Sequence, residues 1–259
     1  MGNVIPSSLF DISGKNAIVT GGNGGIGLAI AEGFVANGAN LLIIGRDYKK
    51  NSLALSRLQK YGTNVFAFSG DISKESQIIQ AIDYANVELN SIDILVNNAG
   101  INIRKSPQDF SVKEWDNVLS VNLKSAFLMS QKVYPFMKKL NKGKIINIGS
   151  MYSVFGSDWS VAYSASKAGL VQMGKSLAMS WAKDNIQVNT ILPGWIETDL
   201  TSPIENLFPE RFETINRRIP FGRWGQPDDL IGTAIFLSSC ASNYLTGTSI
   251  TVDGGYSSF

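Results

Sequence analysis

The sequence predicts an α/β fold, a doubly wound parallel sheet of about seven strands with helices on both faces. Three observations lead to this prediction. The predicted strands are continuously apolar rather than alternating, which is typical of strands buried on both faces. Helical segments separate the strands along the chain, as parallel neighbours require. A glycine cluster at residues 21–27 follows the first predicted strand and precedes the first predicted helix.

The strands are placed by short apolar runs that end at glycine, asparagine, aspartate or proline. They are predicted at residues 15–20, 41–44, 65–68, 92–96, 144–148, 186–192 and 249–252. Because the carboxyl ends of parallel strands meet at one edge of a sheet, residues that follow these runs are expected to gather there.

The intervening segments carry apolar residues at helical spacing. A first helix runs from Ile26 to a stop at Gly38, and further helices are predicted at residues 48–60, 74–89, 111–139, 161–184 and 227–238. Pro135 is expected to bend or break the long helix at 111–139, whereas Pro227 suits a first turn. Residues 203–223 are less regular and form the centre of a mobile substrate flap predicted around residues 195–223.

Length and composition favour one domain spanning residues 1–259, with 44% apolar and 17% charged residues. The net charge is +2 and the basic residues are scattered, so neither nucleic acid nor an anionic membrane is an expected partner. No apolar run approaches transmembrane length, and residues 1–13 lack the pattern of a signal peptide.

The residue types that are absent exclude several kinds of chemistry. The chain has no histidine, which excludes Ser-His-Asp catalysis and most zinc sites, so no metal site is predicted. The single cysteine, Cys240, forms no internal disulfide and lies beside an apolar run, so we expect it in the core. A reducing, cytoplasmic location is the simplest interpretation.

Tyr163 and Lys167 are four residues apart and therefore share one face of the predicted helix at 161–184. An ammonium about 6 Å from a phenol, at an effective dielectric of about 20, stabilises the phenolate by roughly 3 kcal/mol, or about 2 pKa units. Tyr163 would then be a usable general acid or base. Such a pair alone is more often surface packing. Ser150, after the strand at 144–148, would meet a substrate oxygen opposite Tyr163.

The order strand, glycine cluster, helix is the context that a dinucleotide-binding site requires. A 2′-hydroxyl prefers an acid at the end of the second strand, and a 2′-phosphate prefers a base. That strand ends with Gly45, followed by Arg46 and Asp47. Arg46 favours NADP over NAD because a guanidinium can hold a phosphate. Asp47 lies past the strand, and NAD stays an alternative.

Several motifs occur together in one order along the chain, namely Thr20-Gly21-x-x-x-Gly25-x-Gly27, Asn97-Asn98-Ala99-Gly100, Asn122, Ser150, Tyr163-x-x-x-Lys167 and Pro193-Gly194. Over residues 9–256 the chain resembles the compact short-chain dehydrogenases/reductases, which have a Rossmann-type fold. The combination is far more specific than any one motif.

The resemblance implies a role for each matching residue. Tyr163 would be the general acid or base, Lys167 would lower its pKa, and Ser150 would orient the substrate oxygen. Asn122 would hold a water that passes the proton to solvent. Residues that would contact the cofactor are Gly21, Asn23, Gly24, Gly25, Ile26, Gly27, Arg46, Asp71, Ile72, Asn98, Ala99, Gly100, Tyr163, Lys167, Pro193, Gly194, Ile196 and Thr198.

Within the family the chain is most similar to gluconate 5-dehydrogenases and 2-dehydro-3-deoxygluconate 5-dehydrogenases, in residues 97–104, 145–151 and 218–227. Those relatives imply a sugar-acid or polyol substrate, and a homotetramer is the usual family assembly. Arg104 would bind the substrate carboxylate or hydroxyls, together with Ser150 and Tyr163; it would otherwise be an exposed loop arginine. Trp159 and Trp195 are expected either to wall the pocket or to be packing aromatics.

The expected reaction is the interconversion of a secondary alcohol and a ketone, with D-gluconate and 5-dehydro-D-gluconate as the first pair. Two alternatives stay open. One is reduction of another carbonyl, such as a 3-oxoacyl thioester, which Arg104 mildly disfavours. The other is a dinucleotide-binding regulator without catalysis, which would have been free to lose Ser150, Tyr163 or Lys167.

Overall fold

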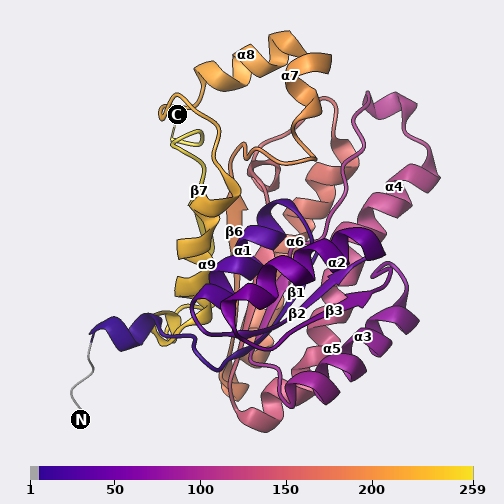
Figure 1. The fold of residues 1–259 in the computed structure, drawn as a ribbon. Helices are drawn as coiled ribbons and strands as arrows, with labels where there is room; N and C mark the ends of the chain where they lie inside the picture. Colours follow the sequence, from indigo (N-terminus) through magenta and orange to yellow (C-terminus); the bar gives the residue numbers. More distant parts are fainter. Residues whose placement is uncertain (1–5, 259) are drawn as a thin grey trace.

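Seven parallel strands form one sheet at the centre of the molecule, in the order β3-β2-β1-β4-β5-β6-β7 (Figure 1). The structure is a computed structural model that describes residues 6–258. The strands are β1 (Asn16–Thr20), β2 (Asn40–Gly45), β3 (Val65–Ser69), β4 (Ile94–Asn97), β5 (Gly143–Ile148), β6 (Ile186–Pro193) and β7 (Ser249–Val252). The predicted Rossmann-type parallel sheet of seven strands is confirmed.

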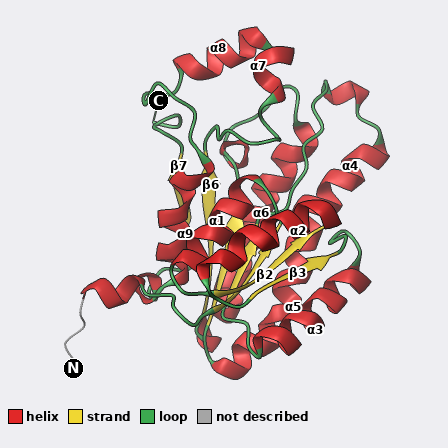
Figure 2. Cartoon of the chain, in the orientation of Figure 1, coloured by secondary structure: helices red, strands yellow, loops and turns green. Residues whose placement is uncertain are grey.

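Helices cover both faces of the sheet (Figure 2). One face carries α1 (Gly25–Ala36), α2 (Tyr48–Leu58) and α9 (Ile231–Ser238). The other face carries α3 (Glu75–Leu89), α5 (Ser125–Leu140) and α6 (Val161–Trp181). Successive strand residues point to opposite faces, and this explains the apolar runs, because every strand position needs an apolar residue.

The alternation is visible in β1. Val19 packs in one cluster with Phe34 of α1, whereas its neighbour Ile18 packs in the other cluster with Ile78 of α3. These four side chains, Ile18, Val19, Phe34 and Ile78, are fully buried, each with 0% of its surface exposed. The two cores together hold the helices rigidly against the sheet, so the loops at the strand ends start from fixed points.

The direction of sheet growth reverses at β1, which lies between β2 and β4. Connections after β1 and β4 therefore leave the sheet toward opposite faces, and a crevice forms between them at the carboxyl ends of the strands. The sheet topology thus places the glycine cluster after β1 and the Asn98 loop after β4 on either side of one opening.

The predicted long helix at 111–139 is interrupted, but not at Pro135. It consists of α4 (Val112–Leu119), a π-helical turn at Ser120–Lys124, and α5, which continues through Pro135 to Leu140. The predicted break at Pro135 is therefore wrong. Val133 and Met137 beside Pro135 are both fully buried, so packing holds the helix across the hydrogen bond that the proline removes.

The predicted flap is also more regular than expected. It contains α7 (Pro203–Leu207) and α8 (Pro209–Arg217), each with a proline in its first turn. These helices stand beyond the carboxyl ends of the strands, at the top of Figure 1. They pack through Ile204 and Ile215 in a third apolar cluster that includes Trp159. The mobility expected for residues 195–223 stays a prediction.

Three predicted helices end or begin as 3₁₀ turns. The 3₁₀ helices are Pro6–Phe10, Gln59–Tyr61, Pro107–Asp109, Met151–Ser153, Ala182–Asp184, Pro227–Leu230 and Cys240–Ser242. Pro227 starts its helical segment as predicted.

Cys240 is exposed, so its predicted core position is wrong. The apolar run belongs to α9, which ends at Ser238, and Cys240 lies beyond the end of this helix. Within residues 6–258 no helix is long and apolar enough to span a membrane.

A glycine at the contact between α1 and α9 tests this packing. A Cβ at Gly33 would lie 2.3 Å from Cγ2 of Ile231, whereas a Cβ at exposed Gly232 would meet nothing within 4 Å. We expect Gly33→Ala to lower the free energy of unfolding by about 1–3 kcal/mol through overpacking. The melting temperature would then fall by about 3–10 °C in a thermal scan.

Gly232→Ala is the matched control, since alanine stabilises an exposed helix position by about 0.5–1 kcal/mol relative to glycine. Its melting temperature should stay unchanged or rise. Equal melting temperatures for the two variants would contradict the proposed close packing of α1 against α9.

Candidate active site

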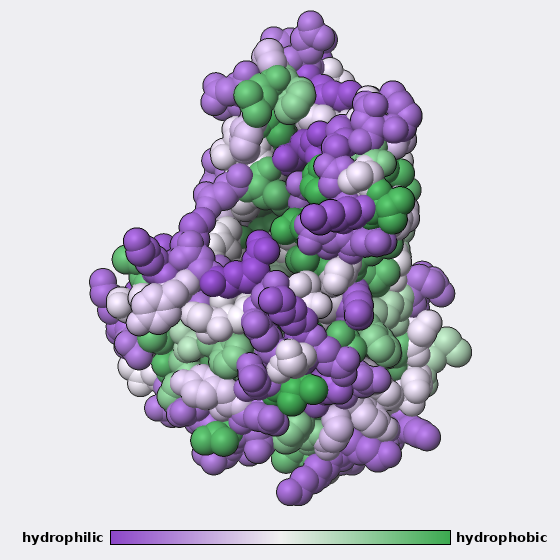
Figure 3. Space-filling model, turned by 90° about the vertical axis from the view of Figure 1, so that its right-hand side faces the viewer, coloured by the Kyte–Doolittle hydropathy of each residue, from purple (hydrophilic) through white to green (hydrophobic). Residues whose placement is uncertain are grey.

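A cavity of about 340 Å³ opens at the carboxyl ends of the strands, on both sides of the switch point. In Figure 3 the molecule is hollowed between the projecting upper part and the main body, with apolar residues at the base of the hollow and hydrophilic residues at its rim. Every predicted cofactor residue lines this cavity except Gly27. The cavity also reaches Ser150, so the predicted cofactor and catalytic residues form one site.

The glycine cluster forms the first wall of the cavity. Gly24 precedes α1 and no side chain caps the helix there, so the N–H groups of its first turn remain available to a ligand. A Cβ at Gly27 would lie 2.2 Å from the carbonyl oxygen of Gly21, and Gly25 has φ +49°. Only glycines allow this tight turn, and the resulting cradle fits a pyrophosphate.

Asn98 holds the glycine loop in place from the other side of the switch point. Its Nδ2 donates to the carbonyl oxygens of Thr20 (3.0 Å) and Gly21 (3.2 Å). In addition, the Thr20 hydroxyl accepts from the backbone N–H groups of Asn98 (3.0 Å) and Ala99 (3.1 Å). The Asn98 amide is therefore engaged by the backbone, and its contribution to a ligand is to shape the cradle.

The end of β2 decides which charge faces the cavity. A Cβ at Gly45 would lie 2.2 Å from Nδ2 of Asn23, which itself donates to Asn51 at 2.6 Å. A side chain at position 45 would therefore require Asn23 and Asn51 to move. Asp47 does not line the cavity, and its carboxylate caps α2 by accepting from the N–H of Lys50. Arg46 does line the cavity and is the basic residue available at the end of β2.

Asp71 and Ile72 close the same end of the cavity, after β3. Burial raises the pKa of the Asp71 carboxyl, but hydrogen bonds from Ser73 and the nearby Arg46 outweigh it and keep that pKa below its ordinary value. The Asp71 carboxylate is thus charged at neutral pH. Ile72 is buried beside it and offers an apolar surface.

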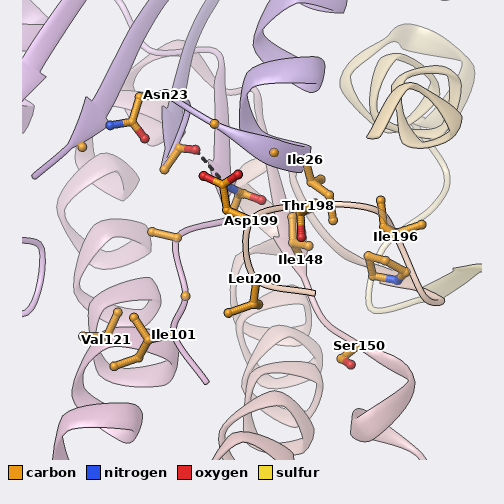
Figure 4. Close-up of a pocket in the computed structure, with 18 of the residues that line it drawn as sticks. Asn23, Ile26, Ile101, Val121, Ile148, Ser150, Ile196, Thr198, Asp199 and Leu200 are labelled. Atoms are coloured by element: carbon orange, nitrogen blue, oxygen red, sulfur yellow. Dashed lines mark hydrogen bonds between the residues drawn. The ribbon is translucent and has the colours of Figure 1, made fainter. Parts of the chain in front are cut away.

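Across the cavity, the loop after β6 supplies the residues that follow Pro193-Gly194. Thr198 lies against the glycine cluster, since a Cβ at Gly25 would come within 3.2 Å of its Cγ2. Figure 4 shows Thr198, Asp199 and Leu200 between Ile26 on one side and Ser150 on the other. Ile196 is buried and pairs with Gly225, so this loop is anchored to the body of the protein.

Tyr163 and Lys167 share one face of α6, and the structure brings both to the cavity with Ser150. The Lys167 Nζ lies 5.6 Å from the centre of the Tyr163 ring, close to the separation expected from the sequence. It donates to the carbonyl oxygen of Ile148 at 2.6 Å, and the lysine is 3% exposed. Burial lowers the pKa of Lys167 to about 8, because desolvation disfavours the ammonium.

The pKa of Tyr163 differs from the expectation. Burial raises the pKa of Tyr163 to about 12, while the hydrogen bond with Ser150 and the charge of Arg104 lower it. The expected net lowering by Lys167 is therefore wrong for the protein alone. Desolvation of the phenolate raises the pKa of Tyr163 by more than the nearby positive charges lower it.

Asn122 lies in the π-helical turn between α4 and α5 and is 2% exposed. Its side chain exchanges two hydrogen bonds with the backbone of Ile101, accepting at 2.8 Å and donating at 2.9 Å, and it also donates to Ser166. It does not line the main cavity, but a Cβ at Gly100 would lie 3.4 Å from its Oδ1 and 3.6 Å from Lys167 Nζ. The Asn122 Oδ1 and the Lys167 Nζ therefore both lie beside Gly100.

A second, smaller cavity of about 70 Å³ adjoins Ser150 and Tyr163 on the side of the flap. Arg104 lines it and is half-buried, so the exposed-loop interpretation of this arginine is wrong. Its guanidinium donates to the carbonyl oxygen of Leu200 at 2.9 Å and lies 5.5 Å from the centre of the Trp159 ring. Burial lowers the pKa of Arg104, although the residue stays protonated.

Five residues that line this small cavity were not predicted from the sequence as site residues, namely Asn102, Met151, Tyr152, Leu200 and Thr201. Tyr152 stands two residues after Ser150, which was the one available signal. Trp195 lines the cavity as expected for a wall, whereas Trp159 packs behind Arg104 with its ring against Phe208. Among residues 6–258 no group of three or more histidine, cysteine, aspartate or glutamate side chains is arranged to hold a metal.

Comparison with known proteins shows the family to which the chain belongs. Residues 21–257 match the family model described as enoyl-(acyl carrier protein) reductase. The chain is 44% identical to the 2-dehydro-3-deoxy-D-gluconate 5-dehydrogenase of Bacillus subtilis, covering 95% of this chain and 96% of that protein. It is 37% identical to the 5-keto-D-gluconate 5-reductase of Escherichia coli, covering 96% and 98%.

Among solved structures, the chain is similar to a gluconate 5-dehydrogenase from Burkholderia cenocepacia in complex with NADP and tartrate. The TM-score is 0.92 at 35% identity, over 97% of this chain and 98% of that one. With a family model across most of the chain, and relatives above 30% identity along nearly its full length, the chain belongs to the short-chain dehydrogenase/reductase family.

Proposed function

We propose that this protein is an NAD(P)-dependent oxidoreductase that interconverts a secondary alcohol and a ketone at C5 of a six-carbon sugar acid. One observation carries the proposal. The glycine cradle opens into the cavity that holds Ser150, Tyr163 and Lys167, and that cavity adjoins a pocket lined by Arg104. A dinucleotide, a proton-transfer group and an anion-binding group thus meet at one place.

The cofactor follows from the residues that would hold it. The Gly21–Gly27 loop and the start of α1 would take the pyrophosphate, and Arg46 would take a 2′-phosphate. The Burkholderia relative is named as a complex with NADP, which supports NADP as the first choice here. When bound, the nicotinamide accepts a hydride from the alcohol carbon in oxidation and returns it in reduction.

The protein's own residues handle the proton. Ser150 would hold the substrate oxygen, and Tyr163 would take its proton as the C–O bond becomes a carbonyl. In the opposite direction Tyr163 gives the proton back, which its pKa of about 12 favours at neutral pH because the hydroxyl is then fully protonated. Lys167 and Asn122, which both lie beside Gly100, would pass protons between Tyr163 and solvent.

The substrate proposal rests on Arg104 and on the relatives. A half-buried guanidinium beside Tyr163 suits a carboxylate or a row of hydroxyls. Relatives of this chain are named 2-dehydro-3-deoxy-D-gluconate 5-dehydrogenase, 5-keto-D-gluconate 5-reductase and gluconate 5-dehydrogenase. All three names specify chemistry at position 5 of a gluconate skeleton. We therefore consider both D-gluconate and 2-dehydro-3-deoxy-D-gluconate.

The two alternatives are less well supported. A small, Arg104-lined pocket does not favour a long acyl thioester. A regulator without catalysis has no need for Tyr163 beside a buried Lys167, because burying a lysine costs free energy that a catalytic role would explain. The homotetramer and the cytoplasmic location stay predictions.

The proposal is tested by measuring initial rates with each acid and NADP, following the absorbance of the reduced nicotinamide. Wild-type protein should turn over at least one acid. Tyr163→Phe should reduce kcat by at least about 100-fold, because proton transfer is lost, with cofactor affinity unchanged. No turnover of either acid, in protein that still binds NADPH, would contradict the sugar-acid assignment; normal turnover by Tyr163→Phe would contradict the mechanism.

Arg46→Ala tests the cofactor. Loss of a charge-assisted hydrogen bond to phosphate should lower kcat/KM for NADP about 10- to 100-fold and leave kcat/KM for NAD nearly unchanged. Lys49→Ala is the matched control, because Lys49 is also an exposed base in this segment but does not line the cavity. A wild-type preference for NAD, or an unchanged NADP rate in Arg46→Ala, would contradict the role of Arg46.

Arg104→Met tests the substrate pocket through two measurements. The KM for the acid should rise about 10- to 100-fold, because a charged partner is lost. The positive charge of Arg104 lowers the pKa of Tyr163, so its removal raises that pKa. Since oxidation needs the deprotonated tyrosine, the rise of the oxidation rate with pH should move to higher pH.

Arg104→Lys is the control that keeps the charge, and its pH profile should stay closer to that of the wild type. If the profile of Arg104→Met coincides with the wild-type profile, the guanidinium does not act on Tyr163.

A further inference from the structure

Tyr152 lies beside the candidate catalytic residues. It follows Ser150 in the 3₁₀ turn Met151–Ser153, which the Ser150 hydroxyl caps by accepting from the Tyr152 N–H at 3.1 Å. Its ring meets the ring of Tyr163 edge to face, with 6.2 Å between centres, and the ring of Trp195 in the same way at 5.9 Å. The half-buried Tyr152 lines the small cavity that Ser150 and Arg104 also line.

The Tyr152 hydroxyl accepts one hydrogen bond and donates none within the described residues. Its oxygen accepts a hydrogen bond from Nε1 of Trp159 at 3.3 Å. In the part of the chain that the structure describes, no acceptor receives the hydroxyl proton.

Trp159 sets the direction of that hydrogen bond. The indole is 7% exposed and lies between the guanidinium of Arg104, 5.5 Å from the ring centre, and that of Arg211, at 4.5 Å. Phe208 packs against it edge to face at 4.8 Å. Its carbonyl oxygen accepts from the N–H of Lys105 at 2.9 Å. Because the indole is held from all these sides, its N–H points in a fixed direction.

An indole N–H is a donor only, so it occupies a lone pair of the Tyr152 oxygen. The O–H of Tyr152 must then point away from Trp159. A half-buried donor without an acceptor is unfavourable, and a ligand that supplies the acceptor is preferred over one that does not. The arrangement therefore selects for a ligand with an oxygen close to the atom that Ser150 and Tyr163 hold.

We propose that Tyr152 determines specificity by donating a hydrogen bond to a hydroxyl next to the reacting carbon of the substrate, and that Trp159 is the positioning residue that orients it. This inference rests on the proposed function. It assigns to the pocket a preference for a polyhydroxylated substrate over a simple ketone, separate from the charge contact of Arg104. For chemistry at C5, the recognised hydroxyl is the one at C4 or C6.

The test compares kcat/KM of the wild type and Tyr152→Phe on the acid that the wild type turns over, and on its 4-deoxy and 6-deoxy analogues. Tyr152→Phe keeps the ring contacts and removes only the hydroxyl. We expect about a tenfold loss of kcat/KM on the full acid and no loss on one of the two analogues, because that analogue lacks the acceptor. The dissociation constant for NADPH should stay unchanged.

Two further variants complete the experiment. Trp159→Phe should lower kcat/KM on the full acid, and should have little further effect when combined with Tyr152→Phe, because the two residues act through one hydroxyl. Tyr244→Phe is the matched control, since Tyr244 is fully exposed and lines neither cavity. It should behave as the wild type.

The outcomes separate the two proposals. If the wild type turns over neither acid, the proposed function falls and this inference falls with it. If the wild type is active and Tyr152→Phe keeps full kcat/KM, only this inference is overturned. An equal loss on the full acid and on both analogues would also overturn it, because the hydroxyl would then be needed for structure rather than for recognition.

Discussion

The hydrogen bonds that join the ends of β1 and β4 are the constraint on which the site depends. Thr20 donates through its hydroxyl to the carbonyl oxygen of Val96 and accepts from two N–H groups of the Asn98 loop, while the Asn98 amide holds two carbonyl oxygens of the glycine loop. These bonds form at the switch point of the sheet, where connections diverge and no neighbouring strand fills the space. They fix the glycine cradle on one side of the crevice and carry the chain toward Ile101 and Arg104 on the other. The loops that form the cofactor side and the substrate side of the crevice thus both start from the joined ends of β1 and β4.

The same crevice explains the electrostatics of the candidate active site. Burial raises the pKa of Tyr163 and lowers that of Lys167 to about 8. At neutral pH Tyr163 therefore keeps its proton and can donate it, whereas Lys167 is still mostly an ammonium. Arg104 adds a positive charge that opposes the burial of the phenolate. The substrate pocket therefore influences the proton-transfer group directly as well as through binding.

Most of the fold could be predicted because the pattern of a doubly covered parallel sheet is local in sequence. All seven strands lie at the expected places, and Ser150, Tyr163 and Lys167 meet because strand ends and one helix turn bring them together. The predicted break at Pro135 was wrong because packing of Val133 and Met137 outweighs the lost hydrogen bond. The helices of the flap were missed because they are short, and short helices depend on contacts such as that of Ile204 with its cluster rather than on periodicity.

The amino-acid pattern alone determined the fold class, the glycine turn after β1 and the placing of Tyr163 and Lys167 on one helix face, because apolar periodicity, glycine geometry and helical spacing act over a few residues. Only the tertiary structure decided the pKa directions and the composition of the substrate pocket, because burial and charge depend on residues far apart in the chain. Position 45 is one example, where a side chain would meet the amides of Asn23 and Asn51. Trp159 is another, since its partners come from two separate segments, Arg104 from one and Phe208 and Arg211 from the other, that only folding brings together.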